Sequence, residues 1–128
     1  MSEDRLARGM QVRREVVGDA YVDRAMATAD EFGAPLQELL GEMCWDWLWT
    51  RDELPRATRS LLNVAMLSVL NRPNELKVHI QGALRNGCTR EEVREALLQS
   101  AVYGGMPCGV EGFRVAREAF AEMEKAGA

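Results

Sequence analysis

Glycine and proline divide this chain into segments of helical length, and this punctuation constrains its fold more than any other feature. Within the segments, apolar residues recur every three or four positions, which is the spacing of one helix face. Pro55 and Pro73 stand where helices begin, because the first turn does not need the amide hydrogen that proline lacks. Gly33 and Gly87 stand where helices end. The pattern predicts an all-α protein.

The punctuation predicts six or seven helices with short connections. Ser2 is expected to cap the first helix, which ends near Val17 and carries acidic residues in its first turn, where they suit the helix dipole. Thr89, followed by Glu92, forms a capping box at another helix start. The remaining helices are expected over residues 20–32, from 35 to about 43, 55–70, 73–86, 89–103, and from the break at 104–107 to about 125.

The helix expected over 55–70 is apolar around much of its circumference. Such a helix is typically central and buried in its domain. Several of the helices are too apolar on all sides for a lone small domain, so we expect the chain to form a homo-oligomer.

The segment from Cys44 to Arg51 is dense in tryptophan, with Trp45, Trp47 and Trp49. The alternation of aromatic residues would suit a short strand, but no other segment offers a strand to pair with it. We therefore expect a helix end that leads into a loop. The tryptophans could form a dry wall beside a bound substrate, although packing in a core or a subunit interface is the more common role of buried aromatics.

The composition restricts the classes of function. A chain of 128 residues is sufficient for one domain, which we expect to span 1–128. The net charge of −4 and the absence of a basic stripe argue against nucleic-acid binding. No apolar stretch approaches the roughly 18 residues of a membrane span. The polar N-terminus lacks the features of a secretory signal, so we expect a cytoplasmic protein.

The three cysteines, Cys44, Cys88 and Cys108, are far apart in sequence. Their odd number and wide spacing argue against a disulfide framework, a CxxC redox motif and a zinc site. We expect free thiols in a reducing compartment.

One histidine, His79, is the residue best suited to proton transfer at neutral pH. Glu75 lies one helical turn before it on the same face, and Arg72 lies at the start of that face. Glu75 could orient the imidazole or raise its pKa, and Arg72 could bind a carboxylate. A Glu–His pair at this spacing is also common on ordinary helices, so the residues alone leave a purely structural role open.

The chain resembles the carboxymuconolactone decarboxylase family over nearly its whole length. The resemblance is carried by Arg13–Asp23, Thr58–Leu67, Asn71–His79, Gly82–Gly87, Arg94–Glu95, Ala101–Gly105 and Phe113–Ala116. It implies a compact helical fold of the alkylhydroperoxidase (AhpD-like) type and a homohexamer.

Thiol peroxidase relatives in the wider superfamily carry a CxxC motif that is followed after three residues by histidine. Aligning that histidine with His79 places Arg72 and Glu75 where the two cysteines would be. The missing cysteine pair favours decarboxylase chemistry over peroxiredoxin activity. A thiol-linked oxidoreductase and a non-catalytic helical oligomer stay open as alternatives.

The resemblance implies decarboxylation of 4-carboxymuconolactone to 3-oxoadipate enol-lactone, in the protocatechuate branch of the beta-ketoadipate pathway of aromatic degradation. Loss of CO2 leaves a carbanion that is conjugated to the lactone carbonyl. The substrate is therefore its own electron sink, and no cofactor or metal is expected.

On this hypothesis His79 delivers the proton and Glu75 supports His79. Arg72 is the first candidate for a carboxylate clamp and Arg51 the second. Trp49, in the tryptophan segment, and Tyr103, beside the Gly104–Gly105 pair, are further candidates for substrate contact. Tyr103 could instead end its helix against the core.

Overall fold

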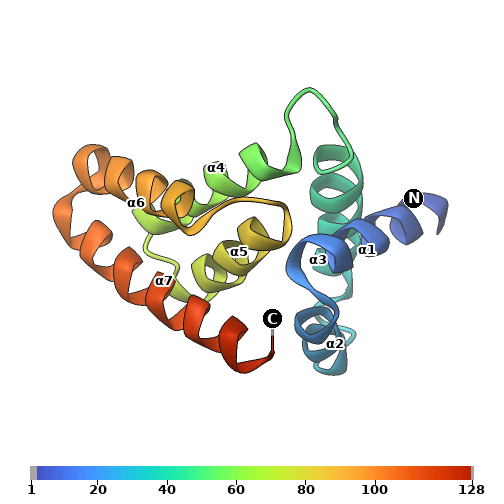
Figure 1. The fold of residues 1–128 in the computed structure, drawn as a ribbon. Coiled ribbons are helices and arrows are strands. Elements are labelled where there is room, and N and C mark those ends of the chain that lie inside the picture. The colour runs from blue at the N-terminus through green and yellow to red at the C-terminus, as the bar shows by residue number, and fades with distance from the viewer. Residues whose placement is uncertain (1–2, 128) are drawn as a thin grey trace. The chain divides into compact units, whose positions relative to one another are not determined.

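The computed structural model describes residues 3–127, and every regular element in that range is a helix (Figure 1). This confirms the predicted all-α class. The proposed cap at Ser2 lies outside the described residues. The helices form two compact units, the first ending at Pro55 and the second beginning at Arg56. That the chain is a single domain stays a prediction.

The first unit contains three α-helices and a π-helix: α1 (Glu3–Val17), α2 (Asp19–Ala27), α3 (Ala34–Leu39) and η1 (Leu40–Leu48). The predicted helix over 20–32 is shorter than expected, because turns follow Ala27. α1 packs closely on η1 at a pair of glycines, where a β-carbon added to Gly9 would lie 2.4 Å from the carbonyl oxygen of Gly41. The backbones therefore meet without intervening side chains.

The tryptophan segment is the clearest departure from expectation. Residues up to Leu48 continue α3 as a π-helix, in which the amide of Trp49 donates to the carbonyl of Cys44 over 3.0 Å. The segment is thus a helix end that leads into a turn and a loop after Leu48, as predicted, whereas the alternative strand is wrong and the π-helical form of the helix was not expected. Trp45 and Trp49, four residues apart, lie on one side of this helix, where their rings stack with centroids 5.6 Å apart. Both rings are buried, whereas Trp47 is 55% exposed.

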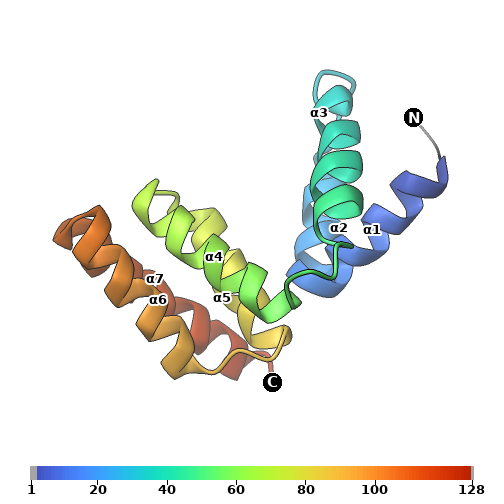
Figure 2. The same ribbon diagram turned by 90° about the horizontal axis from the view of Figure 1, so that it is seen from above.

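The second unit contains α4 (Arg56–Val69), α5 (Pro73–Arg85), α6 (Arg90–Gly104) and α7 (Met106–Lys125). α4 packs against α5 and α6, and α7 packs against the same two helices, so the four enclose one core (Figure 2). Its fully buried side chains include Val64 from α4, Leu76 and Ile80 from α5, and Val93 and Leu97 from α6.

The turns of this unit follow the sequence signals. Asn71 adopts a positive φ of 57° between α4 and α5, a conformation that asparagine tolerates better than most residues. The capping box of Thr89 and Glu92 is confirmed, with both reciprocal hydrogen bonds present. The predicted break at 104–107 is narrower than expected, since only Gly105, with φ 116°, separates α6 from α7.

α4 is central in this unit, as predicted, but it is not buried on all sides. Its outer face exposes Leu62, Met66, Val69 and Leu70, each by 47% or more. These side chains and α6 line an apolar groove of about 900 Å³.

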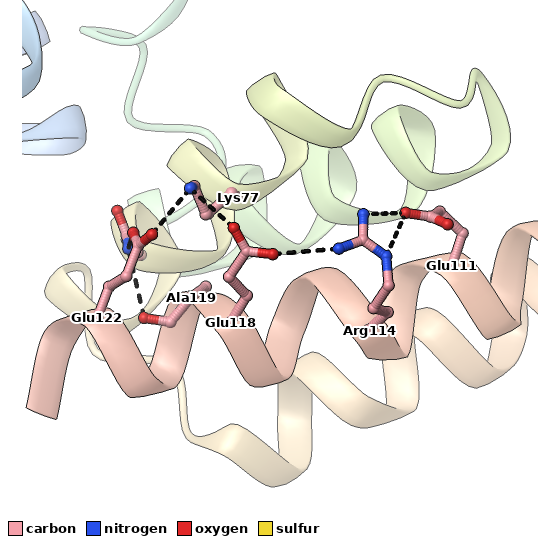
Figure 3. Close-up of polar contacts among 7 residues, drawn as sticks. Lys77, Glu111, Arg114, Glu118, Ala119 and Glu122 are labelled. Carbon is pink, nitrogen blue, oxygen red and sulfur yellow. Dashed lines mark hydrogen bonds and ion pairs between the residues drawn. The ribbon is translucent and has the colours of Figure 1, made fainter.

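Polar contacts join α5 to α7 on the surface of the same unit (Figure 3). The ammonium group of Lys77 donates to Glu118 at 3.2 Å and to Glu122 at 2.9 Å. Glu118 also accepts from Arg114, one turn earlier on α7. The network holds α5 against α7 on the side of the helix where Lys77 lies. Among the described residues, no helix has the length and apolarity needed to cross a membrane.

Candidate functional site

His79 lies in the middle of α5, on the side that meets α4. The short turn at Asn71 folds the two helices back on each other, and Asn63 and His79 are equally far from that turn in sequence. Their side chains meet across the seam, with the amide nitrogen of Asn63 3.4 Å from Nδ1 of His79. A second polar pair lies further along the seam, where Asn86 donates to Ser60 Oγ over 2.9 Å.

The surroundings of His79 favour its neutral form. Ile80 beside it and Leu76 one turn before it belong to the buried core. Burial lowers the pKa of His79 from its usual 6.5 to about 4, and the negative charge of Glu75 offsets only part of this effect. At neutral pH the imidazole is therefore uncharged in the protein without substrate.

The predicted face of Arg72, Glu75 and His79 exists only in part. Glu75 is exposed and acts on His79 through its charge, in the direction the sequence suggested. Arg72 is exposed and lies outside the helix, as the N-cap of α5, with a non-helical φ of −117° and ψ of 77°. The helical spacing used to place it therefore does not apply to it.

Asn63 is the residue of this site that the sequence analysis did not assign. It is a polar, half-buried residue on α4, between Leu62 and Val64. Its equal distance from the turn was the signal that could have paired it with His79. Arg59 lies one turn before Asn63 and is half-buried on the same side of α4, which adds a cation to this stretch of the seam.

Two of the predicted substrate contacts, Trp49 and Arg51, belong to the first unit. Trp49 is 2% exposed, and besides its stack on Trp45 it shares a hydrogen bond with the Cys44 thiol. Within this unit its role is packing. Arg51 is exposed, lies over the Trp47 ring at 5.1 Å from the centroid, and pairs with Glu53.

Tyr103 is not beside His79. It lies at the end of α6, where it lines the apolar groove on the side of α4 away from Asn63. It is 88% exposed, so the alternative that it ends its helix against the core is wrong for this unit. The groove contains none of Arg72, Glu75 and His79 in its lining. This groove is thus separate from the candidate catalytic histidine.

The three thiols are free. Cys88 donates to the carbonyl of Ala57 at the start of α4, whereas Cys108 lies near the end of that helix, where its backbone carbonyl accepts from Ser68. Ala57 and Ser68 are about 16 Å apart along the helix axis at the usual rise per residue. This separation is far beyond the reach of a disulfide between Cys88 and Cys108. Residues 3–127 contain no group of three or more histidine, cysteine or acidic side chains arranged to hold a metal ion.

The part of the chain that contains His79 is similar to a known protein family. Residues 34–118, which include all of α4, α5 and α6, match the carboxymuconolactone decarboxylase family. The chain belongs to this family. The match covers the π-helix, the His79 seam and most of α7, so the family pattern extends over both units.

Two relatives match almost the full chain. A 4-carboxymuconolactone decarboxylase from Acinetobacter baylyi is 34% identical over 121 residues, which cover 94% of this chain and 90% of that protein. The nitrosuccinic acid decarboxylase npaB from Metarhizium robertsii is 39% identical over 119 residues, covering 93% of this chain and 83% of that protein. A 4-carboxymuconolactone decarboxylase from Pseudomonas putida is 50% identical over a shorter match of 32 residues. The named functions of all three are decarboxylations.

Proposed function

We propose that this protein is a carboxy-lyase that decarboxylates 4-carboxymuconolactone to 3-oxoadipate enol-lactone in the beta-ketoadipate pathway. The observation that carries the proposal is the near full-length similarity to a 4-carboxymuconolactone decarboxylase, in a chain whose one histidine lies on a helix seam. This reaction needs no cofactor, because the lactone carbonyl of the substrate accepts the electron pair that remains when CO2 leaves. The protein has to bind two carboxylates, stabilise the developing charge and manage one proton.

His79 is the residue that we place next to the reacting carbon and carbonyl. Glu75 modulates the charge of His79 from the same helix. Arg72, exposed at the start of α5, is the first candidate to bind a substrate carboxylate. Arg59 joins it as a candidate on α4, whereas Arg51, Trp49 and Tyr103 remain proposals for more remote substrate contacts.

A second substrate is favoured by the similarity to the nitrosuccinic acid decarboxylase. Nitrosuccinate is also a dicarboxylate, and loss of the carboxylate next to its nitro group leaves a nitronate. The nitro oxygens then hold the charge that the lactone oxygen would hold. One site with a hydrogen-bond donor facing that oxygen could serve both reactions.

The test is a direct assay of the purified protein with each substrate, following loss of the lactone spectrophotometrically and release of CO2 from nitrosuccinate. We expect acceleration of lactone decarboxylation, with nitrosuccinate as the weaker substrate. The variant His79→Gln should lower turnover on the order of a hundredfold. Absence of catalysis with both substrates in a folded protein would refute the proposed function, and faster nitrosuccinate turnover would reverse the order of the two candidates.

We further propose that the chain works as a homohexamer in the cytoplasm. The exposed apolar side chains of α4 and α6 support self-association, because monomeric proteins seldom leave apolar patches of this kind uncovered. A thiol-linked peroxidase reaction is not favoured, since Cys88 and Cys108 lie near opposite ends of α4.

A further inference from the structure

The contact between Asn63 and His79 indicates which imidazole nitrogen of the neutral ring carries the proton. The side-chain amide nitrogen of Asn63 lies 3.4 Å from Nδ1 of His79. An amide nitrogen donates hydrogen bonds and does not accept them, so in this contact Asn63 is the donor and Nδ1 the acceptor. Nδ1 then has to present its lone pair. In the neutral ring the proton is consequently on Nε2.

We propose that Asn63 is a positioning residue that keeps His79 neutral with its proton on Nε2, so that His79 acts as a hydrogen-bond donor to the substrate oxygen on which charge develops. This inference rests on the proposed function and deepens it. Protonation of Nδ1 would set two donors against each other across the seam. Asn63 therefore disfavours the imidazolium, the form that a simple proton-delivery role would require.

Charged groups on α5, α4 and α7 also lie along this part of the second unit. On α5 itself, Glu75 acts on the ring through its charge. On α4, Arg59 is half-buried one turn before Asn63. On α7 the carboxylates that meet α5, Glu118 and Glu122, are bound to Lys77 (Figure 3). The burial that lowers the pKa of His79 to about 4 acts in the same direction as Asn63.

A neutral donor suits the reaction. When CO2 leaves, the electron pair of the broken bond moves into the conjugated system and onto the carbonyl or nitro oxygen. A hydrogen bond from Nε2 then stabilises that oxygen without transfer of the imidazole proton, and the carbon takes its proton from water. A donor that is already oriented costs no reorganisation when the charge appears.

The first test measures the tautomer directly. Because the chain has one histidine, ¹⁵N labelling of the imidazole gives a single pair of ring signals. In the folded protein without substrate at pH 7, we expect Nε2 to show the shift of a protonated nitrogen and Nδ1 that of an unprotonated one. The reverse assignment would overturn the inference whether or not the protein is active.

The second test uses Asn63→Asp, which replaces the amide donor by an acceptor of the same size. The carboxylate should draw the proton to Nδ1 and favour the imidazolium. We expect the variant to lose kcat/KM progressively as pH rises from 6 to 8, falling at least about tenfold below the unmodified protein at the upper end. The unmodified protein should have a level profile over the same range, because its His79 stays neutral.

Asn86→Asp is the matched control, since Asn86 also makes a polar contact between α5 and α4 but binds Ser60. It should leave both the ring signals and the pH profile unchanged. A level profile in Asn63→Asp, or a fall of equal size in Asn86→Asp, would contradict the positioning role. If neither substrate is turned over, the proposed function fails, while the ring signals still decide the tautomer.

Discussion

At the scale of single residues, the chemistry depends on how one histidine is held. His79 combines a partly buried ring, an amide partner and a nearby carboxylate, and each affects the protonation of the ring. The sequence placed Glu75 and His79 together through helical spacing. It could not weigh burial against the charge of Glu75, because burial depends on helices that are distant in sequence.

The lowered pKa of His79 predicts how folding stability depends on pH. Above pH 6.5 the ring is neutral in both the folded and the unfolded chain, so it has no effect. As pH falls from 6.5 to about 4, the unfolded chain takes up a proton that the folded protein does not, and stability is lost. The loss should be on the order of 3 kcal/mol at the acid end.

Urea unfolding of the protein and of His79→Gln, at a series of pH values from 4 to 7.5, measures this contribution. Both proteins share all other titrating groups, so their difference isolates the ring. The unmodified protein should lose more stability than the variant over this range. Parallel pH curves would show that His79 titrates normally in the folded state.

The thiols give a second prediction at this scale. Replacing Cys44, Cys88 and Cys108 together by serine should leave decarboxylation within about threefold of the starting rate, because Cys88 and Cys108 cannot pair within one unit. A thermal melt of the triple variant controls for misfolding, since Cys88 is buried. Loss of activity in a folded triple variant would favour a thiol-dependent reaction.

At the scale of elements, the contact of α1 with η1 is the most restrictive packing in the first unit. A methyl group on Gly9 would meet backbone atoms of Gly41 that cannot move aside, whereas one on Gly41 would meet the flexible tip of Leu6 at 3.1 Å. We expect Gly9→Ala to lower the free energy of unfolding by roughly 1–3 kcal/mol and Gly41→Ala by less than about 1 kcal/mol. Denaturant unfolding of both variants measures the difference, and equal effects would contradict the close approach.

The helices also differ in how well the sequence predicted them. Proline at the starts of α4 and α5, and the Thr89 capping box, act through neighbours within one turn, and the helices that they mark were predicted within a few residues. The π-helix was missed because its hydrogen bonds shift by one residue, and no residue type in 40–48 signals such a shift. Asn63 was missed because its partner is on another helix.

At the scale of the whole molecule, the prediction concerns assembly. The exposed apolar side chains on α4 and α6 should be covered in solution, so light scattering should give a mass six times that of the chain for the proposed homohexamer. The mass should persist on dilution through the micromolar range. A monomer at all concentrations would contradict the proposal and leave the groove between α4 and α6 to another role.

The π-helix has a further consequence, which concerns insertions and deletions. A π-helical turn contains one residue more than an α-helical turn, so removing any one residue from 40–48 would let the segment relax to an ordinary helix. Side chains after the deletion would then rotate about the axis relative to those before it, and removal of a residue between Trp45 and Trp49 would separate their stacked rings. Homologous chains that keep this tryptophan stack should therefore vary in residue type across the segment but not in its length.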